Sequence, residues 1–244
     1  MPITYEVGAD NGGLIGSVAG SLRLVDVPSL QVSLLKSLAE QPAALLLDLT
    51  ALDVVDPLAL TVFNAVARQA ARWPGTPILL YSLKPLTSEL FAKRVFHQLS
   101  IVDSLDAARA QLATDPESGR ASVSDELLPV RGAARHARDL ATDACLRWDL
   151  PGLAGPASLI ANELVSNVVD HVHTMMTLRL SLRPRYLTVA VRDGSPVEVK
   201  PPGEVPLDAR RGRGLLLVDA TAHSWGCLPS ADGKVVWASL RRAG

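Results

Sequence analysis

The sequence predicts an α/β protein with two successive domains, because strand and helix patterns alternate on both sides of one polar segment. Residues 43–49 form a short apolar run, which is the pattern of a buried strand. Before it, Leu30, Leu34 and Leu38 repeat at the spacing of one helix face, and residues 186–193 alternate as a half-buried strand does. With 48% hydrophobic and 20% charged residues, the chain has the composition of a globular protein.

The first domain is expected at residues 1–112, where apolar residues at helical spacing and at strand spacing continue to alternate along the chain. Asp56 and Pro57 mark one helix start, since aspartate is a preferred N-cap and proline a preferred first helical residue. The expected elements are, in order, a strand at 14–18, a helix at 30–38, a strand at 43–49, a helix at 59–70, a strand at 77–83, a helix at 86–96, a strand at 101–103 and a helix at 105–112.

A polar segment of small residues without either period follows, so a linker is expected at 113–125. The second domain is expected at 126–244, as helices lying on one face of a sheet. Its expected elements are a helix from 133 to 148, a second helix begun at Pro156, and strands at 178–182, 186–193, 223–228 and 234–240.

Glu163 and Asn167 are the most informative residues of the second domain. In a helix begun at Pro156, their side chains lie about 40° apart on one face. Ile160 and Leu164 project over the same arc, so the carboxylate and the carboxamide are directed towards apolar neighbours. Such oxygens suit Mg²⁺, water and an acceptor hydroxyl. The alternative is a partly exposed polar pair at the edge of a helix.

Two features downstream extend this pattern. Asp193 has the parity of Val191 and therefore points to the core side of its strand, where a buried acid would hold a group such as the amino edge of a purine. Gly212 and Gly214 then open an expected helix, and glycines of this kind let the backbone approach a phosphate at a helix N-terminus. Gly-x-Gly alone is also typical of an ordinary loop-to-helix turn. The nearby arginines Arg210, Arg211 and Arg213 are either phosphate partners or a solvated basic loop.

Bulk properties narrow the functional classes. A net charge of −1 gives no electrostatic case for nucleic acid or a membrane surface. Apolar runs are far shorter than the ~20 residues of a membrane span, and the N-terminus has no secretion signal, so a cytoplasmic protein is expected. Cys145 and Cys227 are then expected to be free, although a disulfide between them is left open.

Residues 126–244 resemble the anti-sigma-factor serine kinases, a branch of the GHKL (histidine-kinase-like) ATPase superfamily. This resemblance implies a GHKL-type α/β sandwich that binds ATP and Mg²⁺. Four segments carry it and come in the family's order. They are residues 163–171 (ELVSNVVDH), 191–196 (VRDGSP), 212–218 (GRGLLLV) and 233–240 (GKVVWASL).

The resemblance implies a role for each matching residue. Asn167 would bind the Mg²⁺ that bridges the ATP phosphates, and Glu163 would orient or deprotonate the attacking hydroxyl. Asp193 would hydrogen-bond the adenine amino group, while Gly212 and Gly214 would hinge a lid at 194–211. The other expected cofactor-binding residues are Gly194, Arg213, Leu215 and His171. This chain departs from the family pattern at two places, where Ser195 often is glycine and Val235 often is threonine.

Residues 1–112 resemble a STAS domain, the fold of the anti-sigma-factor antagonists. The resemblance rests on the element order and on residues 45–56 (LLLDLTALDVVD) before a helix. Phosphorylatable members have serines after this aspartate, at a helix start that suits a phosphoserine. Here Pro57 and Leu58 follow, and Thr50 and Thr61 are the nearest hydroxyls.

Together the two resemblances imply a bacterial regulatory protein of the partner-switching type. The expected activity is that of a Mg-ATP-dependent protein-serine kinase and anti-sigma factor, which acts in trans on an antagonist protein. The alternative is an ATP-gated adaptor or antagonist that binds partners without phosphoryl transfer. Expected partners are a STAS-domain antagonist, a sigma factor or both, without direct contact to nucleic acid or membrane. A homodimer is left open.

Overall fold

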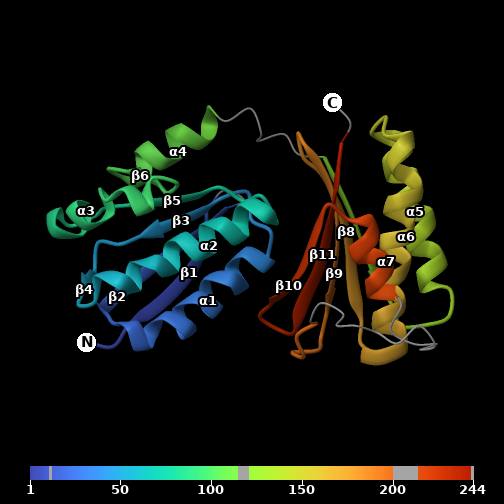
Figure 1. Ribbon diagram of the computed structural model, residues 1–244, viewed down its shortest axis with the longest axis horizontal. Helices are drawn as coiled ribbons and strands as arrows, with labels where there is room; N and C mark the ends of the chain where they lie inside the picture. The colour runs from blue at the N-terminus through green and yellow to red at the C-terminus, as the bar shows by residue number, and fades with distance from the viewer. Residues whose placement is uncertain (11–12, 115–120, 200–213, 243–244) are drawn as a thin grey trace. The chain divides into compact units, whose positions relative to one another are not determined.

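The computed structural model describes residues 1–10, 13–114, 121–199 and 214–242 (Figure 1). The chain divides into two compact units, residues 1–118 and 119–244. None of the helices in the described ranges is both long enough and apolar enough to cross a membrane.

The first unit contains a six-stranded mixed sheet with the order β1-β2-β3-β5-β6, in which β4 also pairs with β2. β1 runs antiparallel to β2, and the other described pairings are parallel. The strands are β1 (Thr4–Asp10), β2 (Gly13–Leu22), β3 (Leu45–Asp48), β4 (Leu52–Val54), β5 (Ile78–Tyr81) and β6 (Ser100–Val102).

Helices cover both faces of this sheet, which explains why β3 is a continuous apolar run (Figure 1). Leu46 lies in the core that contains Ala108 of α4, whereas Leu45 and Leu47 point to the opposite face, where α1 and α2 lie. The helices are α1 (Val27–Ala39), α2 (Thr61–Arg72), α3 (Pro85–Phe91) and α4 (Leu105–Ala113), with 3-10 turns η1 (Leu24–Asp26), η2 (Pro57–Leu60) and η3 (Arg94–Phe96).

The predicted α/β order of the first unit is confirmed, but four details differ. The short strand β4 was not expected between β3 and the next helix. β1 was not predicted, because it is mostly exposed and lacks apolar alternation. The helix expected at 86–96 ends at Phe91, and η3 follows. Asp56 does precede a helix, yet its carboxylate accepts the backbone N–H of Leu24 at 3.0 Å, at the start of η1, and caps no donor of its own helix.

The second unit is a five-stranded antiparallel sheet with the order β10-β11-β9-β8-β7 and three helices on one face (Figure 1). The strands are β7 (Ser122–Leu127), β8 (Met176–Leu182), β9 (Tyr186–Asp193), β10 (Ser224–Pro229) and β11 (Lys234–Arg241). The helices are α5 (Ala133–Arg147), α6 (Pro151–Asn167) and α7 (Gly214–Thr221), and α6 continues into a π-helical turn, η5 (Val168–Val172).

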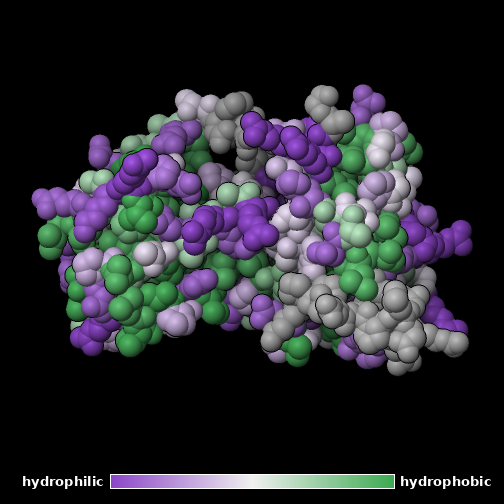
Figure 2. Space-filling view, in the orientation of Figure 1, coloured by the Kyte–Doolittle hydropathy of each residue, from purple (hydrophilic) through white to green (hydrophobic). Residues whose placement is uncertain are grey.

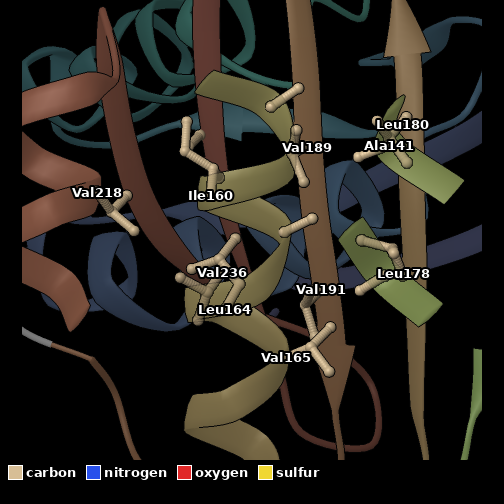
Figure 3. Close-up of a cluster of buried hydrophobic side chains, with 14 of the residues drawn as sticks. Ala141, Ile160, Leu164, Val165, Leu178, Leu180, Val189, Val191, Val218 and Val236 are labelled. Atoms are coloured by element: carbon tan, nitrogen blue, oxygen red, sulfur yellow. The ribbon is translucent and has the colours of Figure 1, made fainter. Parts of the chain in front are cut away.

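The core of this unit lies between the helices and the sheet (Figure 3). Down the view of Figure 3, Ile160 precedes Val165 on α6, and Val189 precedes Val191 on β9. α6 also packs against β9. The two elements therefore run in the same direction, so that their C-terminal ends, Asn167 and Asp193, lie at the same end of the sheet.

Three expectations for the second unit are decided by the structure. Residues 122–125, expected in the linker, form most of β7 and pair with β8; the strand is hard to recognise because it carries little apolar alternation. The helix start at Pro156 is wrong, since α6 begins at Pro151 and Pro156 lies inside it. The prediction of free thiols is confirmed for Cys145 and Cys227.

Candidate functional site

The polar residues singled out in the sequence gather at one end of the second unit's sheet. Asp193 ends β9, and Asn167 ends the helix that runs beside it. β11 begins at Lys234, directly opposite Asp193 in the antiparallel register. α7 begins at Gly214, where an added Cβ would lie 2.5 Å from Oε2 of Glu163. Four elements thus bring the carboxylates of Asp193 and Glu163 to the same end of the sheet.

Asp193 is buried as its parity predicts, and its side chain is 0% exposed. Oδ1 accepts hydrogen bonds from Nζ of Lys234 and from the backbone N–H of Ser195, each at 2.8 Å. Oδ2 is buried and has no hydrogen-bond partner among the described residues. Because buried polar atoms are almost always hydrogen-bonded, Oδ2 is the atom at which a ligand donor fits.

Lys234 is the residue of this site that sequence reasoning missed. Its side chain is 3% exposed and forms an ion pair with Asp193, and Nζ also lies 3.4 Å from the carbonyl oxygen of Ser195. A signal was present, since Lys234 shares its parity with Val236 and Ala238, which face the helices. A lysine at such a position is seldom buried without an acidic partner.

Gly233 lets the backbone before β11 pack directly against the backbone at the end of β9, next to Asp193. A Cβ on Gly233 would overlap the carbonyl oxygen of Asp193 and the backbone of Gly194, so any side chain at 233 would push β9 and β11 apart. The N–H of Gly194 donates to Oγ1 of Thr174 at 3.0 Å, which fixes the exit of β9. The end of β9 is therefore fixed by close packing against Gly233 and by the hydrogen bond to Thr174.

Charges near this strand end are paired. Nε and an Nη of Arg192 donate to Oδ1 of Asp232 at 2.9 and 2.7 Å, across the turn between β10 and β11. The hydrogen bond from Arg192 holds the pKa of the Asp232 carboxyl below its ordinary value. Burial raises the pKa of the Cys227 thiol, against smaller lowerings by a backbone hydrogen bond with Val199 and by the nearby Lys234 charge. The thiol therefore stays protonated at neutral pH.

Glu163 is half-buried and is oriented by its neighbour on the helix. Nδ2 of Asn162 donates to Oε1 of Glu163 at 2.9 Å, and an Nη of Arg138 on α5 donates to Oδ1 of Asn162 at 2.7 Å. Oε2 makes no hydrogen bond with another described residue and lies against the start of α7 at Gly214. One carboxylate oxygen of Glu163 is thus fixed by a hydrogen bond, while the other has no such bond to any described residue.

Asn167 lies one turn after Glu163, where α6 changes to the π-helical turn η5. Such turns are rare and are frequent at functional sites. Asn167 is half-buried, and its side chain makes no hydrogen bond within the described ranges. His171 lies in η5 and is exposed.

No group of three histidine, cysteine or acidic residues in the described part of the chain could hold a metal ion by itself. A Mg²⁺ at Asn167 would therefore take most of its ligands from phosphate and water, as is usual for this ion. Among the other expected site residues, Leu215 follows Gly214 in α7 and packs against the core. Gly212 and Arg213 lie outside the described residues, as does most of the expected lid.

No known protein-family profile matches the chain, and no curated protein is significantly similar to it in sequence. Solved structures of anti-sigma-factor antagonists are similar to its N-terminal part. An anti-sigma factor antagonist from Mycobacterium paratuberculosis shares 22% identity over 46% of this chain and 95% of that chain, with a TM-score of 0.41.

Two further structures give the same result. The anti-sigma factor antagonist SpoIIAA in its unphosphorylated form shares 11% identity over 46% of this chain and 98% of its own, with a TM-score of 0.38. A variant of RsbS from Moorella thermoacetica shares 19% identity over 45% of this chain and 94% of its own, with a TM-score of 0.37. These similarities concern the fold of the N-terminal part alone.

Proposed function

We propose that the second unit binds Mg-ATP and acts as a protein-serine kinase and anti-sigma factor on an antagonist protein in trans. The observation that carries the proposal is the gathering of Asp193, Asn167 and Glu163 at one end of the sheet, with Oδ2 of Asp193 buried and unpartnered among the described residues. The buried acceptor of Asp193 suits a nucleobase amino group, and the carboxamide of Asn167 suits a metal ion. The half-buried carboxylate of Glu163 suits the hydroxyl of a substrate.

In this proposal each residue has one task. Oδ2 of Asp193 accepts a hydrogen bond from the amino group of adenine, and the amide oxygen of Asn167 binds Mg²⁺. The bound ion supplies charge neutralisation at the phosphates. Glu163, fixed through Oε1, uses Oε2 to orient the partner's serine hydroxyl and accept its proton. Backbone N–H groups at the start of α7 donate to the phosphates.

The direct test is the mass of a purified STAS-domain partner after incubation with this chain and Mg-ATP. A gain of one phosphoryl group on a serine is expected. An unchanged mass, with a partner whose acceptor serine is intact, contradicts the kinase activity.

Nucleotide binding is expected to raise the melting temperature of the second unit. At about 100 times its Kd, ATP stabilises the folded state by about 2.7 kcal/mol, which corresponds to about 5–10 °C for a domain of this size that melts independently. Asn167→Ala should remove the Mg²⁺-dependent part, and Asp193→Ala should reduce selectivity for adenine. Thermal denaturation with ATP, GTP and EDTA measures both effects, and equal melting temperatures with ATP, with GTP and in buffer alone would contradict the role of Asp193.

For the first unit we propose a docking surface for a protein partner. Large apolar side chains are exposed around η1 and η2, and the hydrogen bond from Leu24 to Asp56 ties these two turns together. On the visible face of this unit, hydrophobic residues are interspersed with hydrophilic ones (Figure 2). The exposed apolar residues around η1 and η2 are Leu24, Val25, Val55 and Leu58.

This surface is expected to carry no phosphate, because Pro57 and Leu58 occupy the start of η2. The two nearest hydroxyls already donate hydrogen bonds, Thr50 to Oδ1 of Asp48 at 2.6 Å and Thr61 to the carbonyl of Leu58 at 2.7 Å. The unit would then keep one docking shape at all times. Phosphopeptide mapping of protein from cells checks this, and phosphate on Thr50 or Thr61 would overturn it.

One observation favours a second candidate function, an ATP-gated adaptor without phosphoryl transfer. The first unit has Pro57 and Leu58 where an acceptor serine would stand, so it offers this site no hydroxyl at that position. An adaptor would bind ATP and change its affinity for a partner, while the partner's mass stays constant. The mass measurement above separates the two functions.

A further inference from the structure

We infer that Lys234 selects the base of the bound nucleotide, because it occupies one of the two oxygens of Asp193. The inference rests on the proposed nucleotide site and names a determinant of its specificity. Its basis is the unequal state of the two carboxylate oxygens. Oδ1 accepts from Lys234 and from the N–H of Ser195, whereas Oδ2 has no partner in the described part of the chain.

Lys234 is fixed in this place by the fold. It is the first residue of β11 and pairs in register with Asp193, so that the two side chains project from the same face of adjacent strands. Its side chain is 3% exposed, and Nζ lies 3.4 Å from the carbonyl oxygen of Ser195 in addition to its contact with Oδ1. A lysine held in this way leaves a ligand one acceptor and not two.

Purine bases differ in the number of donors that they present to such an acceptor. Adenine offers one amino group beside a ring-nitrogen acceptor. Guanine offers two adjacent donors, its ring N–H and its 2-amino group, which a carboxylate with both oxygens free can accept together. With Oδ1 occupied, one guanine donor would be buried without a partner, which is costly in a dry site. Hypoxanthine has the ring N–H but lacks the 2-amino group.

Nucleotide affinity should be lower for guanine, which presents two adjacent donors to Asp193, than for a base that presents one. We expect the unmodified full-length chain with Mg²⁺ to bind GTP about 10- to 100-fold more weakly than ATP, the range for one unsatisfied buried group. Inosine triphosphate should recover most of this difference. Calorimetric titration with the three nucleotides measures the order. GTP affinity equal to that of ATP, or inosine triphosphate as weak as GTP, overturns the role of Lys234 while ATP binding stands.

A variant tests the cause. Lys234→Met keeps an unbranched apolar stem and removes the ammonium donor, so that Oδ1 keeps only the backbone N–H of Ser195 and can accept a donor from the ligand. The ratio of ATP to GTP affinity should therefore fall at least about fivefold, towards one. Arg241→Met is the matched control, since it removes one positive charge from an exposed position of the same strand. It should leave the ratio unchanged. Thermal denaturation shows whether each variant is folded.

The outcomes remain distinct. A folded Lys234→Met chain that binds ATP and keeps the full preference over GTP overturns the inference. If Lys234→Met does not fold, the comparison of the three nucleotides on the unmodified chain decides it. If the unmodified chain binds no nucleotide, the proposed nucleotide site is itself wrong, and the inference falls with it.

Discussion

Replacing Lys234 by methionine is expected to lower the free energy of unfolding of the second unit by about 3–5 kcal/mol, the usual cost of removing one partner from a buried ion pair. The carboxylate of Asp193 is 0% exposed, and Lys234 is its charged partner. After the substitution Oδ1 keeps the backbone N–H of Ser195 alone. Urea denaturation of the full chain measures the loss, and hydrogen exchange of the β9 amides assigns it to this unit.

A double variant separates charge from packing. Lys234→Met combined with Asp193→Leu leaves neither charge in the core, and replacing both members of a buried pair by apolar residues is often nearly neutral. Most of the lost stability should therefore return, although nucleotide binding should not. Arg241→Met, an exposed change on the same strand, should stay within about 0.5 kcal/mol of the parent chain. A loss as small as this for Lys234→Met would contradict the buried-pair account.

Parity and helical spacing predicted much of this site, because they depend on the chain alone. The alternation that ends at Asp193 places its carboxylate on the core side, as the structure has it. The spacing of Glu163 and Asn167 puts both on one helix, although that helix begins a full turn earlier than expected. A proline at the first helical position is as favourable at Pro151 as at Pro156, so the sequence pattern does not distinguish the two starts.

The sequence patterns could not predict which residues far apart in the chain would contact one another. Asp56 is suited to cap its own helix, yet it accepts from Leu24, which is thirty-two residues away in sequence. The contact between Glu163 and Gly214 likewise depends on α7 packing beside α6. The exposed strand β1 lacks apolar alternation, so that only its pairing with β2 identifies it as a strand. Local patterns contain no information on such contacts.

Substitution of Glu163 is expected to separate ATP binding from phosphoryl transfer. Phosphoryl transfer needs positioning, Mg²⁺ and charge stabilisation from the protein, and Glu163 would touch the incoming hydroxyl and matter chiefly as the bond forms. Glu163→Ala should keep ATP affinity within a few-fold and reduce transfer by ~10²-fold or more, the scale of a lost general base. Glu163→Gln keeps the side-chain size and should show the same reduction, which excludes a packing effect. Asn167→Ala should lose both properties, because Asn167 serves the metal.

The contact with Asn162 sharpens this test. Nδ2 of Asn162 donates to Oε1 of Glu163, so Asn162→Ala should free the carboxylate to rotate and reduce transfer by less than Glu163→Ala does, with ATP affinity intact. Initial rates of partner phosphorylation and titration with ATP measure the two properties separately. If ATP changes the affinity for a partner whose acceptor serine is never phosphorylated, the kinase activity is wrong. The chain would then be a nucleotide-gated adaptor, in which Arg138, Asn162 and Glu163 only order the pocket.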